Sequence, residues 1–265
     1  MITVKATPQP SGKYGDTSCV AGIRIDTEKP SWIRLYPIPF RWLESNSQFS
    51  KYDMIEVDIE RRTVDTRAES YRPKKDSWTT IGHLNPWAPR HEYISKMEPT
   101  TTCKLQKDAS ADTAAPSLGI VYPTDVEKLE FEDHDPWTPE QIGKMRAMAE
   151  QESTALIKQN GEIPAPLIAP RFKVFYRYRC ADKSCKGHRT RTLDWELTAF
   201  QNRFRQDDHA LQTAVEQKFL TEMFAPERES GFFMGNFEKA SHRGSFSILG
   251  TYWPRTTDIN TPTLF

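Results

Sequence analysis

Hydrophobic and polar positions alternate in short runs along the first hundred residues. Residues 52–62 place Ile55, Val57 and Ile59 at every second position, with acidic residues between them, which is the period of a half-buried β-strand. The segments TSCVAGIRI (17–25) and SWIRLYPIPF (31–40) are rich in β-branched and aromatic residues and have turn-forming flanks. Short strands separated by Gly, Pro and Asp predict a β-rich, barrel-like or sandwich module over residues 1–99.

The middle of the chain changes character twice. Residues 100–116 are small and polar and contain no aromatic side chain, which predicts a linker or a mobile loop. A strand and an acidic run follow, and then a helix with strong end signals. Thr138 is the expected N-cap, Gln141 completes a capping box, and Gly161 follows the expected C-terminus. Residues 100–165 are therefore expected to form a linker, a strand and a capped helix.

The last hundred residues, 166–265, show clearer alternation. In RFKVFYRYRC (171–180), one predicted strand face carries aromatic and aliphatic residues and the other carries Lys173, Arg177 and Arg179. Two apolar stripes with helical spacing follow, over 193–204 and 211–223. Two further strand-like segments end the pattern. We expect an α+β fold in which the β-rich module is joined to a smaller α+β module with a zinc-knuckle-like Cys/His loop.

Composition narrows the class of protein without naming a substrate. The chain has 265 residues, with 36 basic and 36 acidic side chains and four cysteines. No apolar run approaches the roughly 20 residues of a membrane helix, and the N-terminal residues lack the pattern of a secretory signal. These features predict a cytoplasmic protein that does not enter a membrane. In that reducing compartment, closely spaced cysteines bind metal more often than they form disulfides.

The segment CADKSCKGH places two thiols and an imidazole within nine residues. Cys180 and Cys185 have the spacing C-x4-C, and His188 follows after two further residues. Short loops of this kind bring ligands to one zinc ion, which prefers four thiolate or imidazole groups. The candidates for a fourth ligand are His209, His242, Cys103 or a water molecule. The alternatives are a cysteine packed in the strand beside exposed neighbours, and a redox or nucleophilic cysteine.

A metal at this segment would be either structural or catalytic. Three protein ligands and a water would make an open, catalytic site, and His188, Asp194 and Glu196 would then serve a metal-dependent nuclease with Glu196 as the general base. Asp194 and Glu196 could instead hold magnesium. Their two-residue spacing on a helix argues against joint ligation, and Asp194 also suits the first turn of a helix. A structural zinc site is the favoured interpretation.

Positive charge is concentrated around the same segment, although the formal net charge of the chain is zero. Between residues 171 and 191 the only acid is Asp182. Cations beside aromatic side chains suit the phosphates and bases of nucleic acid. The acidic run over 127–135 could instead pair with these cations, or they could bind an acidic protein partner. The candidate nucleic-acid-binding residues are Lys173, Arg177, Arg179, Lys183, Lys186, Arg189 and Arg191.

Two motifs together suggest a family. The stretch WIRLYP (32–37) and the later pattern of Cys180, Cys185, Gly187 and His188 followed by DWE (194–196) resemble a group of uncharacterised bacterial proteins. The resemblance implies a bacterial, cytosolic setting and brings no catalytic assignment. The expected function is a zinc-stabilised, nucleic-acid-binding or accessory protein. The alternatives are the metal-dependent nuclease and a regulatory protein-interaction subunit without nucleic acid.

Overall fold

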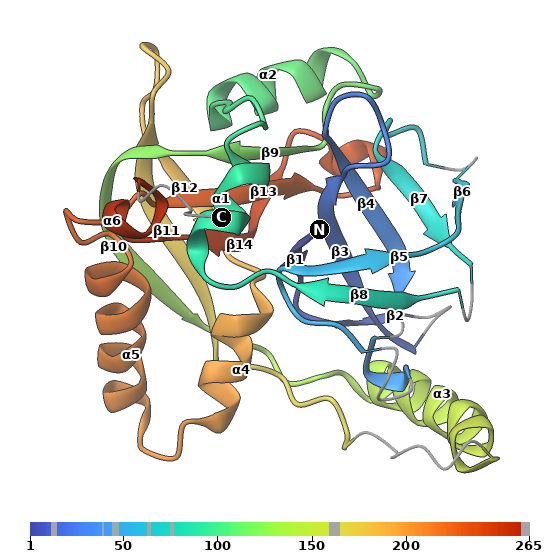
Figure 1. Cartoon of the computed structure of the whole chain (residues 1–265). Coiled ribbons are helices and arrows are strands. Elements are labelled where there is room, and N and C mark those ends of the chain that lie inside the picture. Colours follow the sequence, from blue (N-terminus) through green and yellow to red (C-terminus); the bar gives the residue numbers. More distant parts are fainter. Residues whose placement is uncertain are drawn as a thin grey trace.

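The computed structural model of the chain contains a six-stranded N-terminal sheet, two three-stranded sheets and a two-stranded pair (Figure 1). None of the helices in the described part of the chain has the length and apolar character needed to cross a bilayer. The described residues are 1–11, 15–38, 40–43, 48–62, 65–74, 77–158 and 165–260.

The N-terminal sheet has six strands in the order β1-β3-β4-β7-β6, with β2 paired to β3. Only the β4–β7 pair is parallel. The strands are β1 (Ile2–Lys5), β2 (Gln9–Ser11), β3 (Gly15–Arg24), β4 (Ser31–Ile38), β6 (Ile59–Arg61) and β7 (Ser70–Pro73). A separate pair is formed by β5 (Asp53–Glu56) and β8 (Thr79–His83). The β-rich module is thus confirmed, and because the described strands do not close on themselves, its sandwich-like form is correct and its barrel-like form is not.

Two three-stranded antiparallel sheets pack against each other in the C-terminal part. One has the order β10-β11-β12 and the other β14-β13-β9. The rings of Tyr176 and Tyr178 lie 4.9 and 5.1 Å from the ring of Phe232 across this interface. The strands are β9 (Leu118–Val121), β10 (Pro123–Asp133), β11 (Phe172–Cys180), β12 (His188–Arg191), β13 (Gly231–Asn236) and β14 (Phe246–Tyr252).

Strand β13 lies in a middle layer, and both of its faces are covered. Phe232 and Met234 belong to the core shared with β11, whereas Phe233 packs in a second core with Ile23 of the N-terminal sheet. Every residue of β13 is buried. A strand that is buried on both faces reads as a continuous apolar run, which explains the sequence GFFMGN.

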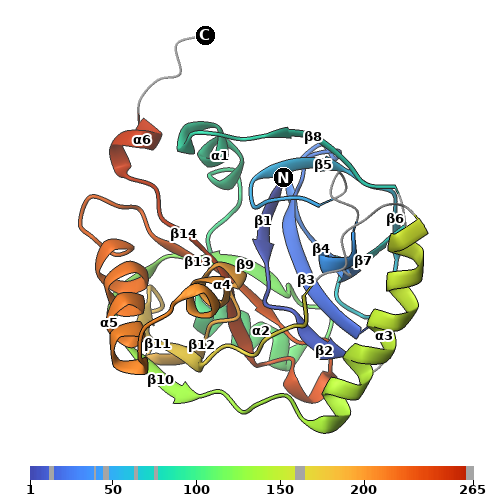
Figure 2. The same ribbon diagram turned by 90° about the horizontal axis from the view of Figure 1, so that it is seen from below.

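The helices pack around these sheets. They are α1 (Trp87–Ile94), α2 (Thr102–Ala111), α3 (Pro139–Lys158), α4 (Trp195–Arg203), α5 (Asp208–Glu216) and α6 (Thr256–Asn260). Helix α5 with the turn after it contributes to the core beneath β11. Shorter helical segments are the 3₁₀ turns Phe40–Trp42 and Ala240–His242 and a π-helical turn, η3 (Gln217–Glu222), that continues α5. Helix α3 lies along β2 and β3 (Figures 1 and 2).

The structure corrects one prediction about the middle of the chain and confirms another. The expected linker or mobile loop over 100–116 is largely helix α2, capped by the Thr101 side chain and buried through Thr102, Leu105 and Ala109. Its buried side chains are mostly small, so their helical spacing is hard to see in a polar segment. The capping box of α3 is present, because Thr138 N donates to Gln141 Oε1 and Gln141 N donates to Thr138 Oγ1. The expected end signal Gly161 lies outside the described residues.

Candidate metal centre and binding cleft

The alternation of strand β11 places its last residue inside the protein. Phe172, Val174, Tyr176 and Tyr178 point inward as predicted, and Cys180 continues this face with 3% of its surface exposed. Successive side chains of a strand point to opposite faces. The same alternation that forms the core therefore delivers the Cys180 thiol to the interior.

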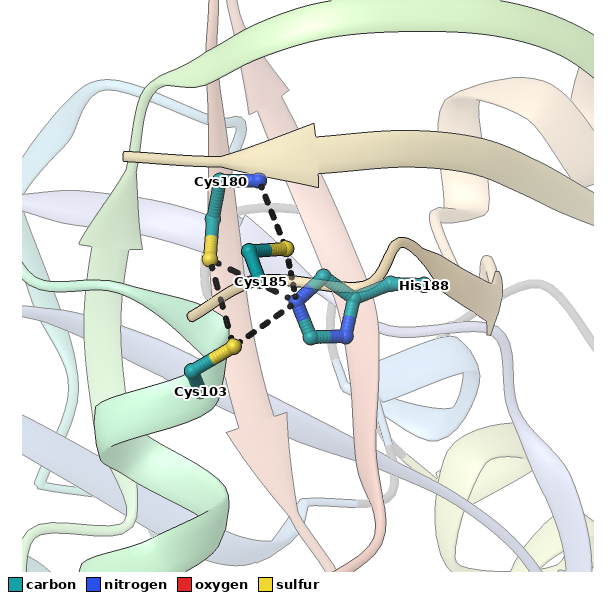
Figure 3. A group of neighbouring side chains, drawn as sticks. All are labelled: Cys103, Cys180, Cys185 and His188. Atoms are coloured by element: carbon teal, nitrogen blue, oxygen red, sulfur yellow. Dashed lines mark hydrogen bonds between the residues drawn. The ribbon is translucent and has the colours of Figure 1, made fainter. Parts of the chain in front are cut away.

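A tight turn after β11 brings two further groups to the same place. Cys185 N donates to Asp182 O at 3.0 Å, and Ser184 N donates to Asp182 Oδ1 at 2.8 Å. Gly187 has a φ of 97°, a conformation that glycine adopts without a steric penalty. His188 then starts β12 opposite Tyr178. The turn thus directs Cys185 and His188 toward Cys180 (Figure 3).

The fourth member of the group comes from helix α2. Thr102 Oγ1 and Tyr178 Oη lie 2.7 Å apart, which fixes the first turn of α2 against β11. The next residue, Cys103, points at the other three groups (Figure 3). Of the four candidates for a fourth ligand, the structure thus brings Cys103 to the cluster. In the described residues, neither His209 nor His242 belongs to this group.

The spacing of the four ligand atoms fits a tetrahedral metal ion. His188 Nε2 lies 3.5, 3.4 and 3.3 Å from the sulfurs of Cys103, Cys180 and Cys185, and the sulfurs of Cys103 and Cys180 are 3.7 Å apart. Zinc bonds of about 2.3 Å to sulfur and about 2.0–2.1 Å to nitrogen set tetrahedral edges of about 3.8 Å (S···S) and about 3.5 Å (S···N). All four atoms lie within 4.8 Å of one another. This cluster of Cys103, Cys180, Cys185 and His188 can hold a metal ion.

The electrostatics of the cluster also favour a cation. Burial, together with the neighbouring Cys180 and Cys185 thiols, raises the pKa of Cys103 to about 12. Burial lowers the pKa of His188, so its imidazole is held in the neutral form that coordinates metals. Several thiolates at such close range repel one another, and a divalent cation removes that repulsion.

The structure does not bring the three candidate nuclease residues together. His188 lies in the cluster, and in the described part of the chain no group with metal-ligand spacing contains Asp194 or Glu196. Asp194 is the N-cap of α4: its Oδ1 accepts from Glu196 N at 2.8 Å, and its Oδ2 accepts from Thr251 Oγ1 at 3.4 Å. Glu196 is exposed. Both oxygens of Asp194 thus already have partners within the protein.

The cations on the outer face of β11 and β12 are largely paired with acidic residues of β10 and of the segment that follows it. Lys173 lies 2.6 Å from Asp135, and Arg177 lies 2.8 Å from Glu130. Arg189 contacts Glu130 at 2.6 Å and also pairs with Glu132. Hydrogen bonds from Arg189 and Arg177 lower the pKa of Glu130 to about 2. The pairing of these cations with acids is the alternative that the acidic run over residues 127–135 suggested in the sequence.

The other candidate nucleic-acid-binding residues have no described carboxylate partner. Arg179, Lys183 and Lys186 are exposed around the Cys/His turn. Arg179 Nη1 donates to the carbonyl oxygen of Cys185 at 3.3 Å. Arg191 is half-buried, and its Nε has no hydrogen-bond partner among the described residues. Among the cations predicted from the sequence, those without a described carboxylate partner therefore lie mainly next to the Cys/His cluster.

A cleft of about 650 Å³ lies where the N-terminal sheet meets α4 and η3. Sequence patterns did not reveal it, because its lining comes from segments far apart in the chain. Its cationic residues are Lys5, Lys51, Arg90, Arg203 and Lys218; its aromatic residues are Tyr52, Trp87, Trp195, Phe200, Phe204, Phe219 and Trp253; its acids are Asp194 and Glu196.

Most cations of the cleft have neutral partners. Lys5 Nζ donates to Phe49 O at 3.0 Å and lies 3.4 Å from the centre of the Phe40 ring. The Arg90 guanidinium lies 4.3 Å from the centre of the Tyr52 ring. Among the described contacts, only Lys51 of the five pairs with a carboxylate, Glu196, at 3.4 Å. The cleft is therefore an electropositive region in a chain without net charge.

Two features of the cleft floor are unusual for a purely structural surface. Tyr52 has a φ of 71°, which is rare for a bulky residue, and its buried hydroxyl has no hydrogen-bond partner among the described residues. Burial, opposed by the charge of Lys51 and assisted by that of Glu196, raises the pKa of Asp194 to about 7. Burial, partly offset by Asp53 and Glu196, lowers the pKa of Lys5 to about 8. Strained backbone and shifted pKa values gather at functional sites.

Comparison with known proteins identifies the family. A model described as "Domain of unknown function (DUF8757)" matches residues 98–265, which is more than half of the chain. The chain belongs to the DUF8757 family. A second model, "Domain of unknown function (DUF8758)", matches residues 1–96, and no curated protein matches the sequence. All four cluster residues lie in the DUF8757 part, whereas the cleft takes residues from both parts.

Proposed function

We propose that the chain is a zinc-stabilised protein that binds single-stranded nucleic acid. In this proposal the Cys/His cluster holds a structural zinc ion, and the single-stranded nucleic acid binds in the cleft. Three thiolates and one imidazole form a ligand set typical of structural zinc. Four protein ligands fill a tetrahedron and leave no position for a reactive water. The ion would hold α2 to the β11–β12 hairpin, because Cys103 lies in α2 and the other three ligands lie in the hairpin.

The basic residues at the turn suit this zinc site. Three thiolates and a divalent cation leave a net charge of about −1 on the centre. Arg179 already donates to the Cys185 carbonyl, and Lys183 and Lys186 lie in the same turn. In this proposal, these three cations offset the charge of the centre, and their contact with nucleic acid is secondary.

The observation that carries the nucleic-acid proposal is the chemistry of the cleft. Five cations and seven aromatic side chains line one cleft, and among the described contacts only one of those cations pairs with an acid. Proteins that bind single strands combine a positive groove for the phosphates with rings on which bases stack. A volume of about 650 Å³ lies in the range of sites that enclose small organic ligands. A double helix is too wide to enter it, which favours unpaired nucleotides.

Metal analysis tests the first half of the proposal. Protein purified without added chelator is expected to carry about one zinc ion per chain, and Cys103→Ser is expected to lower that content. Cys19→Ser is the matched control, because Cys19 lies outside the cluster. A fully folded protein that contains no zinc, and takes up none when it is supplied, contradicts the proposal.

Binding of labelled single-stranded DNA and RNA, followed by fluorescence anisotropy, tests the second half. Arg203→Ala with Lys218→Ala should weaken binding at least about tenfold at low salt and should make the salt dependence shallower. The matched control is Lys173→Ala with Arg177→Ala, which removes two paired cations from the β11 face and should change affinity by less than about twofold. A larger loss in the control pair would move the interface to that face, and no binding by the unmodified protein would reject the proposal.

A further inference from the structure

A second cavity, of about 360 Å³, lies between the N-terminal sheet and the β13–β14 hairpin. We propose that it binds a small molecule that carries a carboxylate or phosphate group on an apolar body, with Arg34 receiving the anionic group. The cavity shares no lining residue with the cleft described above. The inference is therefore independent of the proposed nucleic-acid binding.

The inference starts from the contacts of Arg34 on β4. Only 3% of this residue is exposed, yet it lines the cavity. Its Nη1 donates to Cys19 Sγ at 3.0 Å, and its Nη2 donates to Ser117 O at 3.0 Å. Its Nε is buried without a hydrogen-bond partner in the described structure. Among the described residues, the acceptors that contact this guanidinium are thus all neutral: the Cys19 thiol, the Ser117 carbonyl and the Ser117 hydroxyl.

A neighbouring arginine on the same cavity shows the contrast. Arg67 is equally buried, at 3% exposed, but its Nη2 lies 2.6 Å from Asp65 Oδ2 and its Nε lies 2.9 Å from Asp65 Oδ1. Its remaining nitrogen, Nη1, donates to Asn236 O at 2.9 Å. The charge of Arg67 is therefore compensated inside the protein. Arg34 has no such carboxylate within 4 Å in the described part of the chain.

The acid that shares Ser117 with Arg34 and the acid that lines the cavity both have other partners. Glu69 accepts from Ser117 N at 2.7 Å and from Ser117 Oγ at 3.2 Å. Glu238, which lines the cavity, pairs with Arg62 at 2.9 Å. A buried charge without a counter-ion is strongly unfavourable. A bound anion at the cavity end of Arg34 would remove that cost.

The walls define the rest of the ligand. Leu193 and Leu249 line the cavity, as does Phe237, which is 44% exposed. At Gly235, a Cβ would lie 3.0 Å from Arg34 Nη2, so glycine lets the guanidinium approach β13. A planar guanidinium matches the oxygens of a carboxylate or phosphate, and apolar walls suit a hydrocarbon or aromatic body.

Binding to the zinc-loaded full-length chain tests this inference by calorimetry and thermal melting. Benzoate and phenyl phosphate are the probes, acetate and inorganic phosphate are the bare anions, and benzamide is the uncharged match. We expect the better of the two probes to bind at least about tenfold more tightly than its bare anion, and benzamide to give no melting shift. Tighter binding of benzoate would indicate a carboxylate ligand, and tighter binding of phenyl phosphate would indicate a phosphate ligand. Equal behaviour of benzamide and both probes overturns the inference.

Two further measurements place the ligand in the cavity. Cys19 is half-buried and lines the cavity, so a saturating probe should slow its alkylation by iodoacetamide at least about threefold, as measured by peptide mass spectrometry. Arg34→Met should abolish binding, whereas Arg177→Met on the β11 face should not. If Arg34→Met does not fold, the alkylation of the unmodified chain decides the question. Unchanged Cys19 labelling at saturation would contradict the placement.

Discussion

The outer face of β11 and β12 and the cleft beside α4 both collect cations and aromatic rings, but they use them differently. On the strand face, Arg177 and Arg189 share one carboxylate, Glu130 of β10. In the cleft, Lys5 and Arg90 contact carbonyl groups and ring faces instead. The density of positive residues in the sequence is higher on the strand face, yet the unpaired charge lies in the cleft. Availability of charge therefore depends on the partner strand.

The largest expected effect concerns the Cys/His cluster beside the strand face. Cys180→Ser removes one member of the Cys/His cluster, which the proposal assigns as a zinc ligand, and leaves the cleft lining unchanged. We expect the free energy of unfolding to fall by more than about 4 kcal/mol, because zinc binding is coupled to folding. Hydrogen exchange should speed up first in α2 and in the β11–β12 turn. A stability equal to that of the control Cys19→Ser would show that the cluster is not a zinc site.

A smaller effect is expected from removing a ring of the cleft. Trp253→Leu keeps an apolar side chain but removes a surface for base stacking, which contributes about 1–3 kcal/mol per base. Single-strand affinity should fall about tenfold. Trp78→Leu is the control, since Trp78 stacks on Phe49 in the N-terminal core at 5.2 Å and does not line the cleft. An equal loss in both variants would indicate a general effect on folding.

The next effect in size is a pH dependence of stability that arises in the cleft, from Asp194. The pKa of Asp194 is raised to about 7 in the folded protein, against about 3.9 in an unfolded chain. The folded state therefore binds more protons between these values, and stability should decrease as the pH rises from about 4 to 7, by at most about 1.4 kcal/mol per pH unit.

Asp194→Asn should flatten that part of the profile, because the amide can still cap α4 and does not ionise in this range. Lys51 and Glu196 face the same carboxyl group, and both side chains are kept in this variant. Urea unfolding at a series of pH values measures the slope. An identical slope in both proteins would remove Asp194 as its source.

The smallest expected effect is also the most direct test of the comparison. Glu130→Gln removes the carboxylate that Arg177 and Arg189 share, while Arg189 keeps its pair with Glu132, so the strand face should gain positive potential. Single-strand affinity should rise by up to about threefold at low salt, and the gain should disappear at high salt. Glu127→Gln is the control, because no described ion pair involves Glu127. A loss of affinity would mean that Glu130 itself supports the binding surface.

Features within one segment were well predicted from the sequence. The alternation of β11, the capping box at Thr138 and Gln141, and the convergence of Cys180, Cys185 and His188 all depend on residues close together in the chain. The helix α2 was missed because its inward side chains are mostly small. The cleft was missed because Lys5, Arg90 and Lys218 are joined only by packing between distant segments.

The sequence by itself determined an α+β protein and a turn in which three metal-binding groups are close neighbours, since short loops and strand periodicity restrict where those side chains point. Only the tertiary structure selected Cys103, 77 residues before Cys180, as the fourth group, and only it paired Arg177 of β11 with Glu130 of β10. Contacts between distant segments depend on how whole layers pack. A local pattern restricts its own strand or turn, but it does not specify which distant side chain will face it.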